Sequence, residues 1–137
     1  MVRAEVIRRR LQKLDEYLII LKSLQKYSQD EFLANPEIYG STERFLQLAI
    51  ETITDLGEHV VADLHLGETN WHSDIPNILA EKEYISSELR EKWIRMIGFR
   101  NILVHDYLDI NRKIVYEVLQ SKLKDIQELK VFFASFL

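Results

Sequence analysis

Long stretches without glycine or proline are the feature of this sequence that most constrains its fold. The 137 residues include only 4 Gly and 2 Pro, and apolar side chains recur every three or four residues in the segments between them. This spacing places apolar residues along one side of an α-helix, whereas a half-buried strand requires strict alternation. We therefore predict an all-α protein that forms one helical domain over residues 1–137.

Capping residues and breakers divide the chain into four long helices, which we expect to form an antiparallel bundle of four to five helices joined by short turns. Ser41 or Thr42 is the expected N-cap of the second long helix, and Asn35-Pro36 is expected to end a short helical turn before it. The long helices are expected at about residues 3–27, at 41–66, from 86 or 87 onward, and from 111 to the C-terminus.

Charge is distributed unevenly along a chain whose formal net charge is -4. Residues 1–29 carry 7 basic and 3 acidic side chains, residues 30–85 carry 2 and 12, and residues 86–137 carry 9 and 7. Neutralisation of phosphates supplies most of the nonspecific affinity for nucleic acids, so the acidic middle segment argues against a DNA-binding protein. Contact with RNA is expected only at the two basic ends, or where two copies of the chain pool them.

Four arginines are weak candidates for RNA contacts. Arg8, Arg9 and Arg10 form a basic run in the first helix, and Arg95 precedes the polar segment discussed below. Basic side chains on a helix are commonly just solvated, which is the alternative for all four.

The absence of cysteine excludes disulfides and thiolate metal sites, and a reducing cytoplasm is the natural compartment for such a chain. No apolar run reaches the roughly 18 residues of a membrane span, and the first ten residues lack the apolar core of a signal peptide. We therefore expect a cytoplasmic protein without a membrane partner.

The segment FRNILVHDY, residues 99–107, concentrates polar chemistry within an otherwise apolar region. On a straight helix Arg100 and His105 point about 140° apart, whereas Asn101 and His105 share a face. Arg100 and His105 can reach the same small pocket in only two ways. Either the helix breaks between them, or two protomers supply the pieces across a symmetric interface.

These residue types suit cleavage of a phosphodiester whose own ribose hydroxyl is the nucleophile. Histidine transfers protons near neutral pH, and the arginine fork matches two phosphate oxygens and stabilises charge that develops at phosphorus. Asparagine can hold the histidine or the phosphate in place by a hydrogen bond. The scheme requires neither a metal ion nor a cofactor. The structural alternative is that Arg100 complements the helix dipole, His105 caps carbonyls and Tyr107 packs.

The spacing Arg100, four residues, His105, one residue, Tyr107 resembles the signature of the HepT-like family of HEPN-domain proteins. The resemblance extends over nearly the whole chain, since RFLQLAIETITDLGEHV, IPNILAEKEYIS and RMIGFRNILVHDYLDI are also similar to segments of this family. It implies a HEPN-type helical fold.

The resemblance also implies a function, that of the toxin in a toxin–antitoxin pair. Such toxins are metal-independent RNases that work as homodimers on mRNA or tRNA, with Arg100 and His105 as the catalytic residues and Asn101 in support. The antitoxin is a minimal nucleotidyltransferase similar to MntA proteins, which silences the toxin by adding AMP to Tyr107. The alternatives are a binding module of the nucleotidyltransferase that cleaves nothing, and a purely structural dimer.

One further set of residues has the spacing of a metal site. Asp55, His59 and Asp63 recur every four residues and share one helical face, yet an exposed acidic face with a partnered histidine explains them better. His65 and His72 have no recognised ligand spacing, so we predict no metal site in this chain.

Three other side chains have open roles. Trp71 is expected to cover the open end of the bundle rather than to bind a partner. Glu43 and Glu51 can orient Arg100 by ion pairing, although a solvated location is an equal alternative.

Overall fold

The computed structural model describes all residues, 1–137, and every regular element in it is helical. This confirms the all-α prediction. The elements are α1 (Ala4–Leu24), α2 (Gln29–Ala34), α3 (Pro36–Asp63), α4 (Asp74–Glu81), α5 (Ser87–His105), the 3-10 turn η1 (Tyr107–Asp109), α6 (Arg112–Ser121) and α7 (Leu123–Ala134). None of these helices has the combination of length and apolar character that crossing a membrane requires.

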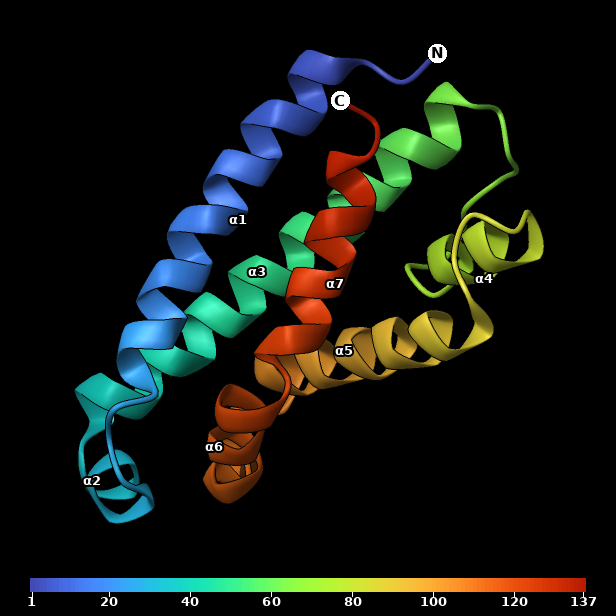
Figure 1. Ribbon diagram of the computed structural model, residues 1–137. Coiled ribbons are helices and arrows are strands. Elements are labelled where there is room, and N and C mark those ends of the chain that lie inside the picture. The colour runs from blue at the N-terminus through green and yellow to red at the C-terminus, as the bar shows by residue number, and fades with distance from the viewer.

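Helix α3 is the centre of the fold, because it contacts each of the other six α-helices. In Figure 1, α1 and α3 run side by side in opposite directions, α7 packs over them, and α5 crosses the lower part of this arrangement. The end of α5 therefore lies beside α6, far from the N-terminal turns of α1.

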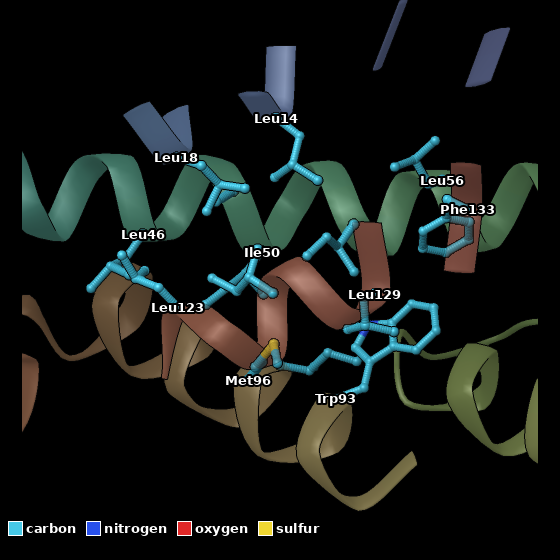
Figure 2. Packing of buried hydrophobic residues seen from close by; sticks show 14 of the residues in the cluster. Leu14, Leu18, Leu46, Ile50, Leu56, Trp93, Met96, Leu123, Leu129 and Phe133 are labelled. Carbon is cyan, nitrogen blue, oxygen red and sulfur yellow. The ribbon is translucent and has the colours of Figure 1, made fainter. Parts of the chain in front are cut away.

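A single cluster of 28 buried apolar residues joins α1, α3, α5 and α7. Figure 2 shows Leu14 and Leu18 of α1 packed against α3. Trp93 of α5 lies on the other side of α3 from these leucines, near Phe133 of α7. The rings of Trp93 and Phe133 meet edge to face, with centroids 5.8 Å apart, an arrangement that adds to the apolar burial of both rings.

Gly57 allows Trp93 to approach α3 closely. A Cβ atom at this position would lie 2.5 Å from Cγ2 of Ile75 and 2.7 Å from Cη2 of Trp93, which is closer than packed carbon atoms can lie. The indole of Trp93 donates a long hydrogen bond of 3.4 Å to Oγ1 of Thr54, also on α3. These contacts hold α4 and α5 against the central helix.

The predicted start of α3 at Ser41 or Thr42 was wrong, since the helix begins five residues earlier. Asn35 is the N-cap, and its side-chain oxygen accepts a hydrogen bond from the N–H of Glu37 at 2.9 Å. Pro36 ends α2 and also begins α3, because a first-turn position needs no N–H donor. Thr42 is fully buried, and its hydroxyl donates to the carbonyl of Ile38.

The predicted continuous last helix is two helices. The chain turns at Lys122, whose φ of -111° and ψ of -3° end α6 before α7 begins. The turn lets α6 pack on α2 and α3 while α7 packs on α1, α3 and α5. A single straight helix cannot contact both sets of neighbours.

Candidate functional site

The polar segment lies at the C-terminal end of α5, which continues without a break through Arg100 and Asn101 to His105. Asp106 is the C-cap, and its N–H donates to the carbonyl of Ile102 at 2.9 Å. The chain then forms η1, which begins at Tyr107. A helix break between Arg100 and His105 is therefore excluded, since the break comes after His105.

The unbroken helix separates the two side chains within one protomer. Five helical residues turn the side-chain direction by about 140° and advance it by about 7.5 Å. Arg100 points toward α3, with 20% of its side chain exposed, whereas Asn101 and His105 are exposed to solvent. Of the two arrangements considered from the sequence, only a second copy of the chain can bring an arginine and a histidine together.

Glu51 of α3 holds the guanidinium of Arg100 in place. One carboxylate oxygen, Oε2, accepts from Nε at 3.4 Å and from Nη2 at 3.2 Å, and Asn101 Oδ1 accepts from Nη1 at 3.2 Å. Gln47, one turn before Glu51, donates to both oxygens of that carboxylate at 3.3 Å. The expectation that Glu51 orients Arg100 is confirmed.

This arrangement leaves a defined edge of Arg100 free. Of the five N–H bonds of a guanidinium, one on Nε, one on Nη1 and one on Nη2 are used. One N–H bond remains on Nη1 and one on Nη2. They can donate to two oxygens of one phosphate, which is the recognition geometry that arginine favours.

The sequence prediction did not include Gln47, although the spacing of Gln47 and Glu51, four residues apart on one helix, was a signal for the contact.

Glu43, the other acidic candidate, pairs with Arg112 of α6 instead, at 3.2 Å. Burial raises the pKa of the Glu43 carboxyl, and Arg112 partly offsets that effect. Arg112 also lies over the ring of Tyr39, 4.1 Å from its centroid. These contacts fix α6, which follows the polar segment.

Next to Arg100 is a small pocket of about 250 Å³ between α3, α5 and the loop before α4. Glu51, Asp55 and Glu58 line it together with Arg100 and His72. Glu51 pairs with Arg100 and Asp55 pairs with Arg10, which leaves Glu58 as the carboxylate of this pocket without an ion pair.

The other side of the segment presents apolar and aromatic side chains to solvent. Tyr107 is 62% exposed and Leu108 is 82% exposed, and Ile102 and Ile114 are each nearly half exposed. Four large apolar side chains around the end of one helix form a surface suited to contact with another protein.

The arginines proposed for RNA contact are separated by the fold. Arg10 pairs with Asp55 of α3, Arg9 makes only a loose pair with Glu5 at 3.9 Å, and Arg8 is exposed without an ion pair. All three lie in the N-terminal half of α1, and Asp55, the partner of Arg10, lines the pocket beside Arg100. Arg95 is exposed on α5 itself, five residues before Arg100.

The carboxylates of the possible metal triad are engaged by arginine. Asp55 accepts from Arg10, and Asp63 accepts from Nε of Arg3 at 3.1 Å. The hydrogen bond from the Arg3 side chain lowers the pKa of Asp63 below its ordinary value. His59 lies 3.2 Å from Nη2 of Arg3. The histidine is therefore partnered and the acidic face is occupied by basic side chains from α1.

The prediction that Trp71 covers the end of the bundle was wrong, because 75% of this residue is exposed. The loop that carries it is held by Asp74, whose carboxylate accepts from the N–H groups of Asn70 and Trp71, each at 2.9 Å. These two backbone hydrogen bonds lower the pKa of Asp74.

Comparison with known proteins identifies the family of this chain. Residues 7–131 match the family described as Ribonuclease HepT-like. The chain is 31% identical over 121 residues to the tRNA nuclease HepT of Aphanizomenon flos-aquae, covering 87% of this chain and 81% of that protein. It is 34% identical over 83 residues to the mRNA nuclease HepT of Shewanella oneidensis, covering 61% and 62%. The chain belongs to the HepT-like ribonuclease family.

Solved structures support the same fold. The tri-AMPylated HEPN toxin of Shewanella oneidensis, in complex with its MNT antitoxin, superposes with a TM-score of 0.88 at 24% identity, over 95% of this chain and 97% of that one. A toxin–antitoxin complex with AMP-PNP gives 0.85 at 23% identity, over 93% and 97%. The fold is thus of the HEPN type.

The contacts of Glu51 make it a positioning residue. We expect Glu51→Ala to lower kcat for RNA cleavage by about ten- to a hundredfold, because a misdirected guanidinium no longer meets the phosphate. The Glu51→Gln variant retains an acceptor oxygen and should recover part of kcat. Single-turnover assays measure the rate of RNA cleavage, and thermal melting measures the stability of each variant.

Glu58→Ala is the matched control, because Glu58 lines the same pocket and makes no ion pair. A loss of activity in Glu51→Ala that follows a fall in melting temperature, without recovery in Glu51→Gln, contradicts the positioning role.

Proposed function

We propose that this chain is an endoribonuclease toxin of a toxin–antitoxin pair, active as a homodimer. The observation that carries the proposal is the free edge of Arg100, held by Glu51 and Asn101 at the end of a helix that also presents His105 to solvent. Membership in the HepT-like ribonuclease family supports it. We further propose that it acts in the cytoplasm, where RNA is abundant.

Two protomers complete the proposed site. The exposed apolar side chains at the end of α5 and in η1, including Ile102 and Leu108, are the surface proposed for the dimer contact. A two-fold axis there places Arg100 of each protomer opposite His105 of its partner, since a symmetric interface brings the same patch of both copies together. The cleft between them receives the RNA backbone.

The proposed reaction is transesterification by the RNA itself. His105 takes the proton of a ribose 2′-hydroxyl, and the oxygen attacks the adjacent phosphorus as the bond to the 5′-oxygen breaks. The leaving oxygen takes up a proton from an imidazolium, and the products are a 2′,3′-cyclic phosphate and a 5′-hydroxyl. Arg100 donates to the phosphate oxygens and stabilises the charge that develops there. No step requires a metal ion.

The proposed partner is a minimal nucleotidyltransferase antitoxin of the MntA type, and the proposed modification is AMP transfer to Tyr107. The similar structures include a tri-AMPylated HEPN toxin bound to an MNT antitoxin. Tyr107 is 62% exposed and lies two residues after His105. AMP groups there bring negative charge and bulk to the place proposed for an RNA phosphate, so they oppose binding.

The substrate is proposed as RNA, either tRNA or mRNA. The relatives are named for one substrate each, tRNA in Aphanizomenon flos-aquae and mRNA in Shewanella oneidensis.

Replacement of His105 tests the chemistry. We expect His105→Ala to reduce RNA cleavage by at least about a hundredfold, because the proton transfer loses its general base. Cleavage is measured with purified protein, with and without a chelator, and the product ends are analysed for cyclic phosphate.

The control for this replacement is His65→Asn. His65 is exposed at the far end of α3 with a φ of 53°, a conformation that asparagine tolerates. Unchanged cleavage in His105→Ala, or loss of cleavage on chelation, contradicts the mechanism.

Tyr107→Phe tests the silencing. This variant should cleave RNA like the wild type but resist inhibition by the nucleotidyltransferase and ATP, since the acceptor hydroxyl is gone. Transfer of labelled AMP and residual nuclease activity are measured together.

Tyr84→Phe is the matched control, because Tyr84 is also exposed, at 41%, and lies away from the polar segment. AMP transfer to the Tyr107→Phe protein at the wild-type level contradicts the assignment. Transfer to a wild-type protein that cleaves no RNA favours the alternative function, a binding module of the nucleotidyltransferase.

A further inference from the structure

A second cavity lies on the opposite side of α5 from the acidic pocket. It has a volume of about 550 Å³ and is formed where α5 meets α3, α6 and α7. Its floor is apolar and includes Met96 and Phe99 of α5, Val118 of α6 and Ile126 of α7. A cavity of this size with an apolar floor can hold a ligand as large as a nucleotide.

The rim of this cavity carries cations that have no partner within the protein. Arg95, Lys122 and Lys124 are exposed, and none of them makes a salt bridge or a side-chain hydrogen bond. They come from α5 and from the junction between α6 and α7. The turn at Lys122, which divides the last helix, brings the two lysines to the same opening as Arg95.

The carboxylates near this rim are engaged elsewhere. Glu88 and Asp125 line the cavity, but both lie within salt-bridge distance of Lys92, at 3.6 and 3.7 Å, and Glu128 contacts the same lysine at 3.4 Å. Burial lowers the pKa of Lys92, but the three carboxylates outweigh this effect and raise it above its ordinary value. The cavity lining as a whole holds four cations, Lys92 and the three rim residues, against the two carboxylates of Glu88 and Asp125, so the cavity is net basic.

A ligand that matches both the rim and the floor has an anionic group attached to a flat apolar one. A nucleotide of single-stranded RNA has both, because its phosphate can meet the cations while its base lies on the apolar floor. The cavity also adjoins the proposed catalytic segment along α5. Phe99 directly precedes Arg100, and Arg95 lies about 15 Å from His105 along the helix axis, a span that a few nucleotides cover.

We infer that this cavity, with Arg95, Lys122 and Lys124 at its rim and Met96 and Phe99 in its floor, binds an unpaired nucleotide of the RNA substrate outside the cleaved bond. The inference rests on the proposed ribonuclease function and deepens it. The cavity is a binding subsite, so it contributes to affinity and not to the chemical step.

The first test compares two triple variants. Arg95→Ala/Lys122→Ala/Lys124→Ala removes the rim cations, and Arg44→Ala/Lys22→Ala/Lys82→Ala removes one arginine and two lysines that are exposed and unpaired elsewhere. We expect the rim variant to raise KM for RNA about tenfold with kcat nearly unchanged. The slope of log affinity against log salt should become less steep by about 2, because each lost contact with a single strand contributes about 0.7.

The second test locates the base. The His105→Ala protein, which should bind RNA without cutting it, is photocrosslinked to RNA that contains 4-thiouridine and is then digested with trypsin. Cleavage after Arg95 and Arg100 releases residues 96–100, the peptide that carries both Met96 and Phe99. We expect crosslinks in this peptide. In the rim variant the loss of Arg95 places Met96 and Phe99 in the tryptic peptide 93–100, and we expect no crosslinks there.

The outcomes separate this inference from the proposed function. If the wild-type protein neither binds nor cleaves RNA, both are wrong. If it cleaves RNA while the two triple variants behave alike and crosslinks avoid residues 96–100, only the nucleotide subsite is wrong. If the rim variant binds RNA normally but loses affinity for the nucleotidyltransferase, the cavity is a protein contact and the inference fails.

Discussion

An unbroken helix that holds Arg100 and His105 on different faces is the constraint on which the account depends. Because α5 keeps its backbone hydrogen bonds to residue 105, one protomer cannot direct both side chains at one phosphate. The sequence spacing that resembles a catalytic motif is therefore half of a site. In the proposed homodimer a second copy supplies the other half, so the proposal ties activity to assembly.

Helix α3 serves both the core and the site. On one turn, Ile50 is buried in the core, while the next residue, Glu51, pairs with Arg100. The packing that stabilises the fold thus sets the position of the guanidinium. The Arg100 side chain therefore needs little further ordering to bind a phosphate. Charge also differs across α5. The pocket beside Arg100 is lined by three carboxylates, two of which pair with arginines, whereas the cavity on the other side has three cations without an ion pair. In the proposed function this difference favours RNA on the side of the cavity.

The sequence was sufficient to predict the all-α fold because helical periodicity and caps are local signals. It offered the link between Glu51 and Arg100 only as one of two equal alternatives, which the packing of α5 on α3 decided. Other features depend on tertiary contacts and were missed. The division of the last helix at Lys122 follows from what α6 and α7 pack against, and the exposure of Trp71 follows from the loop that Asp74 holds. The cavity beneath Arg95 combines four helices, which no local pattern reveals.

Mixed dimers test the central claim most directly. Arg100→Ala and His105→Ala proteins are each expected to be inactive, and they are unfolded together and refolded so that protomers exchange. If each site takes its arginine from one protomer and its histidine from the other, every mixed dimer keeps one intact site, and the mixture should recover about a quarter of wild-type cleavage. If the mixture forms mixed dimers and stays inactive, the two residues act within one protomer and the account is contradicted.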